Sequence, residues 1–94
     1  MTSNATLKVD AGKYVVIAKS WLVNSNPQFD NGIDCRLFVD GLAGNDWCSL
    51  YLPKNTGMTA PPDGNNGVLL TQMMAGTIDQ TGYVHVVCRA GREQ

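Results

Sequence analysis

The sequence predicts an all-β fold, an antiparallel β-sandwich that is jelly-roll-like and has about six strands. Apolar residues alternate with polar ones or run in short blocks, so the period is two and not the 3.6 of a helix. Gly, Asn, Asp and Pro bound these blocks roughly every ten residues, and no helical segment separates them. The 94 residues are therefore expected to form one β-sandwich domain over residues 1–94.

The expected strands are apolar or alternating runs between turn signals, namely residues 5–9, 13–23, 33–40, 46–52, 68–75 and 82–90. Residues 10–12 separate the first two strands and predict either a hairpin or a switch between sheets. Residues 76–81 are expected to join the last two strands. Residues 53–67 have no periodicity and contain Pro61 and Pro62, which predicts a long surface loop or extended arm.

Alternation in two of these strands predicts a common core. Its expected members are Ile33, Cys35, Leu37, Val84, Val86 and Cys88. Cys35 and Cys88 are thus core cysteines, and two unbonded side chains are favoured over a disulfide because nothing on the chain establishes an oxidising compartment. Cys48 is unpaired in either case, and its sequence neighbours provide no base that would activate it as a nucleophile.

Composition and motifs argue against several classes of function. The net charge is −1 and neither sign forms a run, which disfavours nucleic-acid binding. No apolar stretch approaches the roughly 20 residues that span a bilayer, and no signal peptide is expected. The cysteine spacing and the single histidine disfavour a zinc site, and the Asp- and Asn-rich segments are interpreted as turns and not as calcium ligands. With no nucleophile motif present, we expect no catalytic residue, no metal, no cofactor and no enzyme activity.

The outward positions are richer in aromatic residues than a solvated surface requires. The interface candidates are Phe38, Trp47, Tyr51, Tyr83 and His85, together with Pro61 and Pro62 of the loop. The strand at residues 13–23 is also apolar on both of its sides. Exposed apolar surface on a small domain indicates a partner, and a subunit interface is favoured over a carbohydrate platform.

Three segments occur in a familiar order: A-G-K-Y-V-V-I-A-K-S from residue 11, D-C-R-L from residue 34 and G-Y-V-H-V-V-C from residue 82. Together they resemble bacterial and tailed-phage jelly-roll modules, which carry A-G-x-Y-x-V-x-A-K, then C-x-L, then V-x-L-x-C. The resemblance implies assembly and display on a virion or tail surface, or in trimeric globular heads, more than catalysis. Related modules often continue with another strand, so we expect a neighbouring subunit to complete an edge here.

The resulting functional expectation is a structural virion protein, a small phage head-decoration (cement) subunit. It would act as a homo-oligomer, with a trimer expected, and contact the major capsid protein. Its location would be the capsid exterior after synthesis in the host cytoplasm, without a nucleic-acid or membrane partner. The alternative is a glycan- or receptor-binding tip module of a tail fibre or trimeric surface protein, which would use exposed aromatic rings as stacking surfaces.

Overall fold

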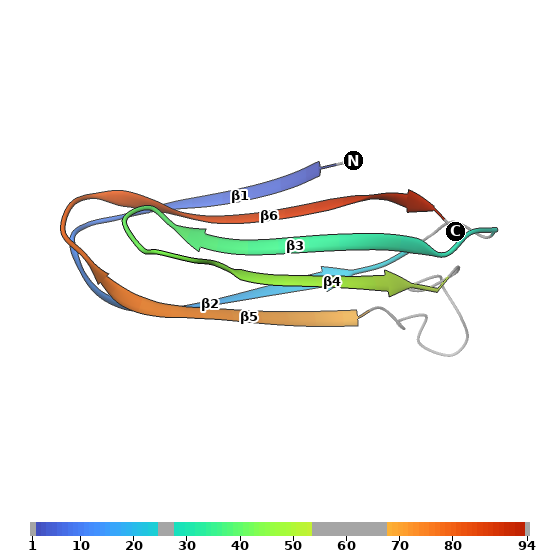
Figure 1. The fold of residues 1–94 in the computed structure, drawn as a ribbon, viewed down its shortest axis with the longest axis horizontal. Coiled ribbons are helices and arrows are strands. Elements are labelled where there is room, and N and C mark those ends of the chain that lie inside the picture. The colour runs from blue at the N-terminus through green and yellow to red at the C-terminus, as the bar shows by residue number, and fades with distance from the viewer. Residues whose placement is uncertain (1, 25–27, 54–67, 94) are drawn as a thin grey trace.

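The computed structural model describes residues 2–24, 28–53 and 68–93, and within these ranges the chain forms six strands and no helix (Figure 1). The strands are β1 (Thr2–Val9), β2 (Gly12–Leu22), β3 (Asn31–Val39), β4 (Asp46–Leu52), β5 (Val68–Ile78) and β6 (Gly82–Glu93). The predicted all-β antiparallel sandwich is confirmed. The predicted loop at 53–67 lies, apart from Pro53, outside the described residues.

The strands pair in a nested order: β1 with β6, β2 with β5 and β3 with β4, all antiparallel. Because β3 also pairs with β6, one sheet has the order β1-β6-β3-β4, and β2 and β5 form a second sheet. Every connection except that between β3 and β4 passes from one sheet to the other, and those from β1 to β2 and from β5 to β6 lie at the same end of the molecule (Figure 1). Of the two alternatives for residues 10–12, the structure therefore selects the sheet switch. This wrapping of one long hairpin over two sheets is jelly-roll-like.

Several strands are longer than the alternation predicts, and β5 shows why. Gly76 was expected to begin the connection to β6, yet it lies inside β5 opposite Tyr14 of β2. A Cβ placed on Gly76 would come within 2.6 Å of Cδ2 of Leu42. The glycine is therefore explained by the close approach of the Leu42 side chain and not by a turn.

The expected common core is divided into two clusters. Toward the ends of β2 and β4 lie Leu22, Ile33, Cys35 and Leu52, with Cys88 packed against them. Toward the connections from β1 to β2 and from β5 to β6 lie Leu37, Val39, Ile78 and Val84, with Val86 packed against them. Gln72 occupies the inward position of β5 between the two clusters and is only 2% exposed. The core was expected to be continuous because the sequence offers no means of foreseeing that a glutamine would be buried there.

Cys35 and Cys88 are direct cross-strand partners on β3 and β6, and a disulfide joins them. The expectation of two unbonded cysteines is therefore corrected. The register provides the physical reason, because directly opposed positions of antiparallel strands bring the two Cβ atoms close together. Cys48 is free, as expected, and is partly buried.

Candidate interaction surfaces

The outward aromatic residues project from one face of the four-stranded sheet. They come from three neighbouring strands, β3, β4 and β6, and are Phe38, Trp47, Tyr51, Tyr83 and His85. Trp47 is 61% exposed, Tyr51 53% and Tyr83 44%. We call this surface the aromatic face, and its role as an interface stays a prediction. Pro61 and Pro62 lie outside the described residues.

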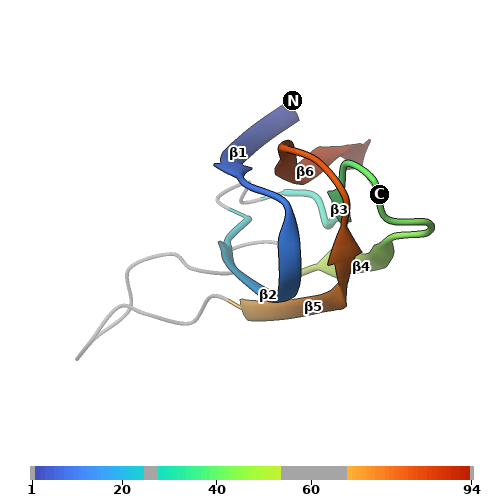
Figure 2. The ribbon, with the colours of Figure 1, turned by 90° about the vertical axis from the view of Figure 1, so that its left-hand side faces the viewer.

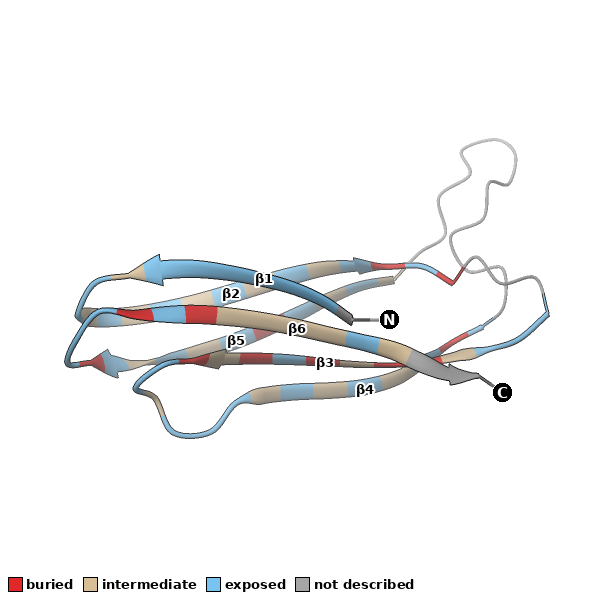
Figure 3. Cartoon of the chain, turned by 90° about the horizontal axis from the view of Figure 1, so that it is seen from above, coloured by how far each residue is buried: buried red, intermediate tan, exposed pale blue. Residues whose placement is uncertain are grey.

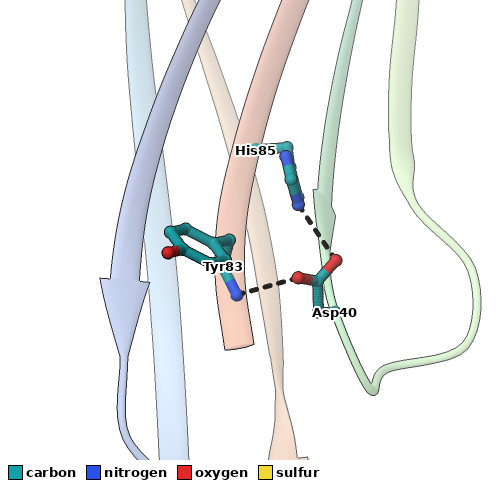
Figure 4. Close-up of polar contacts among 3 residues, drawn as sticks. All are labelled: Asp40, Tyr83 and His85. Carbon is teal, nitrogen blue, oxygen red and sulfur yellow. Dashed lines mark hydrogen bonds and ion pairs between the residues drawn. The ribbon is translucent and has the colours of Figure 1, made fainter. Parts of the chain in front are cut away.

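His85 is held in a fixed orientation at one end of the aromatic face (Figure 4). Its ring stacks on Phe38, its cross-strand partner, with ring centroids 4.5 Å apart and an interplanar angle of 10°. Its Nε2 atom lies 2.9 Å from Oδ1 of Asp40, and the backbone N–H of Tyr83 donates to Oδ2 of the same carboxylate at 3.0 Å. The carboxylate and the stacked ring thus position the imidazole, whose side chain is 25% exposed.

The turn that follows β3 brings Asp40 to the start of β6. Gly41 adopts a φ of +89°, a left-handed conformation suited to glycine, and the N–H of Leu42 donates to the carbonyl of Val39 at 3.1 Å. The backbone N–H of Asp40 also donates to the carbonyl of Tyr83 at 2.9 Å. The hydrogen bond with His85, followed by that from the Tyr83 N–H, holds the pKa of the Asp40 carboxyl below its ordinary value.

A shallow hollow of about 370 Å³ lies on the same side of the four-stranded sheet. The residues that line it combine two guanidinium groups, one carboxylate and apolar side chains, and are Asp34, Arg36, Phe38, Trp47, Val87 and Arg89. The Arg36 guanidinium lies 6.0 Å from the centroid of the Trp47 ring, which is cation–π distance. Ser49 donates to the Asp34 carboxylate at 2.6 Å. The hollow therefore presents charged donors beside an exposed aromatic ring.

The outer side of the β2–β5 sheet has a different chemistry. Along both strands, residues facing the core alternate with exposed residues (Figure 3). Large apolar side chains fill many of the exposed positions: Val15 (67% exposed), Ile17 (57%), Trp21 (52%), Leu69 (55%) and Met73 (59%). Ile17 is the cross-strand partner of Met73, and Trp21 that of Leu69. We call these five residues the apolar face, and Lys13 and Lys19 are its exposed charged neighbours on β2.

A groove of about 1160 Å³ opens between β1 of one sheet and β2 of the other. In Figure 2, these two strands lie on the same side of the molecule, away from β3 and β4. Core-facing side chains such as Val16 and Val86 line the groove, together with Leu7 of β1, which is 64% exposed. Ile17 and Trp21 also line it, so the groove is continuous with the apolar face around the edge of β2.

Alternation in the sequence predicted the exposed apolar side of β2 but not the matching side of β5. Residues 68–75 form a nearly continuous apolar block. Gln72 is a polar residue in this block from which the outward positions of the strand would be inferred. A lone glutamine in such a block suggests an outward position, whereas here it points into the core and turns Leu69 and Met73 outward. The contact between Asp40 and His85 was also missed, because 45 positions separate the two residues and no local motif connects them.

Two acidic residues of the Asp- and Asn-rich segments accept hydrogen bonds within the domain. Asp40 accepts from the Tyr83 N–H, and Asp46 accepts from the Met73 N–H through Oδ2 at 2.8 Å. Among the described residues, no three His, Cys, Asp or Glu side chains gather where they could hold a metal ion. No helix in the same part of the chain is long and apolar enough to cross a membrane.

No protein-family model, curated protein or solved structure matches this chain. Two surfaces of the domain are candidates for binding a partner. One is a polar and aromatic face with a shallow hollow, and the other is an apolar face joined to an open groove.

Proposed function

We propose that this protein is a non-enzymatic structural subunit that acts as a homo-oligomer, with a trimer expected. In finer detail, we propose a phage head-decoration subunit that binds the major capsid protein on the outside of the shell. The observation that supports self-association best is the continuity of the apolar face with the groove between β1 and β2. Resemblance to phage jelly-roll modules supports the choice of partner.

The extent of the apolar surface supports association. From their exposed fractions, the five side chains of the apolar face and Leu7 present roughly 600 Å² of apolar area, the upper end for a single patch on a monomeric protein. A standard interface covers about 800 Å² on each partner. Burying this surface against another subunit is favourable by about 25 cal/mol for each Å² removed from water, before the cost of association is subtracted.

The open edge of β2 supports the same proposal. In the described part of the chain β2 pairs only with β5, so its other edge has unpaired backbone groups next to the groove. An exposed edge beside apolar side chains is a site where another strand adds readily, and a neighbouring subunit is the partner that a homo-oligomer supplies. A decoration subunit stabilises a shell because it binds only the assembled form, and many symmetric copies multiply a modest contact.

The aromatic face supports one alternative, a glycan- or receptor-binding tip. Exposed Trp47 and Tyr51 provide rings on which a sugar can stack, and the hollow beside Trp47 contains Arg36 and Arg89 as hydrogen-bond donors. Rings flanked by polar donors are the usual composition of a saccharide platform. This alternative uses the opposite side of the sandwich from the apolar face, so the two functions can be tested separately.

Sedimentation and light scattering on the purified protein, followed by mixing with undecorated capsids, test the main proposal. We expect the wild type to be oligomeric and to raise the temperature at which capsids disrupt. The paired substitutions Ile17→Lys and Met73→Lys place charge on the apolar face, and we expect monomers that no longer protect capsids. The control pair, Trp47→Lys and Tyr51→Lys, places the same charges on the aromatic face and is expected to leave oligomerisation intact.

A monomeric wild type that binds no capsid would overturn the decoration proposal. If the same protein binds a defined glycan on an array, and Trp47→Ala or Tyr83→Ala abolishes that binding, the receptor-binding alternative replaces it. Circular dichroism of every variant is needed so that a loss of binding can be distinguished from unfolding.

A further inference from the structure

The three cysteines of this chain lie in one row across the four-stranded sheet. Cys35 on β3 is directly opposite Cys48 on β4 and also directly opposite Cys88 on β6. The sheet order β6-β3-β4 makes Cys35 the middle member of this row. Cys35 is bonded to Cys88, and Cys48 is a free thiol.

All three side chains belong to the same side of the sheet. Directly opposed residues of antiparallel strands point to one face, with Cβ atoms about 4.5–5.5 Å apart, and a disulfide requires about 3.5–4.5 Å. Cys35 is fully buried, whereas Cys48 and Cys88 are partly accessible on either side of it. A free thiol therefore lies one strand away from one cysteine of an existing disulfide, on the same side of the sheet. From the Cβ separations above, the two strands must approach by about 1 Å for the new bond to form.

We propose that this row is a thiol–disulfide exchange site, in which the disulfide shifts between Cys35–Cys88 and Cys35–Cys48. The Cys48 thiol loses its proton to water, and the thiolate attacks Sγ of Cys35. The Cys48–Cys35 bond forms as the Cys35–Cys88 bond breaks, and Cys88 leaves as a thiolate that takes a proton from water. The number of disulfides and thiols is unchanged, so no oxidant or reductant is consumed.

Exchange changes where the free thiol lies. Cys88 lines the groove between β1 and β2, whereas Cys48 does not line that groove. With the Cys35–Cys48 bond in place, the groove wall carries the Cys88 thiol, and its thiolate can attack a small disulfide that enters the groove. The S–S bond of that molecule then breaks, one half stays on Cys88 as a mixed disulfide and the other half leaves as a thiolate. The accessible surface of the groove thereby becomes open to covalent modification by small disulfides. This proposal does not depend on what the protein binds.

Differential labelling of the purified wild-type protein tests the exchange. The protein, with one disulfide and one thiol, is incubated without denaturant at several pH values between about 7 and 9, with a small aromatic disulfide as the probe. Mass spectrometry of the peptides then locates the label and the remaining disulfide. We expect label on Cys88 together with a Cys35–Cys48 disulfide, in a proportion that rises with pH as thiolate forms. Label confined to Cys48, with Cys35–Cys88 intact at every pH, would overturn the proposal.

Two variants control the experiment. In Cys48→Ser no attacking thiol remains, so we expect no label on Cys88. Label there would show that Cys88 is a free thiol without exchange from Cys48, and it would count against the proposal. In Cys88→Ser we expect Cys35 and Cys48 to form a disulfide under mild oxidation of the folded protein. If that variant folds and retains two free thiols, the geometry of the exchange is refuted. If it does not fold, the position of the label in the wild-type protein still decides whether the exchange occurs.

Discussion

The sandwich has two lateral sides, along which the edges of the two sheets come together, and these lateral sides are closed to different degrees. On one side, β4 and β5 are joined across the sheets: the Gln72 amide donates to the carbonyl of Asp46 at 2.8 Å, and the Met73 N–H donates to the Asp46 carboxylate at 2.8 Å. On the other side, β1 and β2 border an open groove in which Leu7 is 64% exposed. The same pair of sheets therefore has a closed side and an open side.

This difference shows how four strands can pack on two. A two-stranded sheet is narrower than its partner, so it can complete the core along only one side. Here β5 contacts both β3 and β4, and the fully buried residues Leu37 and Leu52 come from those two strands. On β1, Val9 packs against the core, whereas Leu7 is left exposed. The closed side is expected to provide stability, and the open side to provide surface for a partner.

A matched pair of leucine substitutions tests this division most directly. Leu37 is fully buried and Leu7 is 64% exposed. We expect Leu37→Ala to lower the free energy of unfolding by about 2–5 kcal/mol, because it leaves a cavity, and Leu7→Ala to change it by less than about 0.5 kcal/mol. Chemical denaturation of both variants measures the two values. Equal losses would show that the groove is closed in solution.

The next largest effect is expected at Gln72, the polar side chain of the closed side. Its Nε2 donates to the carbonyls of Cys35 and Asp46 at 3.0 and 2.8 Å. Gln72→Leu keeps the volume approximately but removes both bonds, so we expect a loss of about 1–3 kcal/mol by chemical denaturation. The control Gln80→Leu alters an exposed glutamine and is expected to be nearly neutral. A gain in stability at position 72 would contradict this role, and it would show that the unpartnered Oε1 costs more than the two bonds provide.

A smaller effect is expected when the Asp46 carboxylate is removed. Asp46→Ala deletes the acceptor for the Met73 N–H but preserves the Asp46 carbonyl that receives the Gln72 bond. Because the carboxylate bond is exposed, we expect a loss of about 1 kcal/mol, measured by thermal denaturation. Asp79→Ala removes an exposed carboxylate elsewhere and serves as the control. Indistinguishable melting of the two variants would show that this contact does not help to close the sandwich.

The smallest effect is a pH dependence at the turn after β3, away from both sides. The pKa of Asp40 is lowered in the folded protein by His85 and the Tyr83 N–H, so the folded state favours the ionised carboxyl. This contribution is fully present above the ordinary carboxyl pKa of about 3.9 and is lost as the pH falls through the lower folded value. We expect the difference in Tm between wild type and Asp40→Asn to shrink below about pH 4. A difference that is constant throughout the acid range would contradict the assignment.

The pattern of the sequence predicted the strands and most of their faces. Alternation in β3 and β6 placed Leu37 and Val84 inward and Phe38 and His85 outward, and the structure agrees. It failed where a residue's position depends on partners far along the chain. Gly76 was expected in a connection because the sequence does not reveal that Leu42 packs against it.

The sequence by itself determined the all-β class, the approximate strand positions and the apolar character of both sides of β2, because these follow from local alternation and turn residues. Only the tertiary structure decided which strands pair, that Cys35 lies between two other cysteines, and that Gln72 divides the core. It also decided which side of the sandwich is open. Local pattern fixes which face of a strand is apolar, whereas strand order and register depend on long-range pairing that no short stretch of sequence encodes.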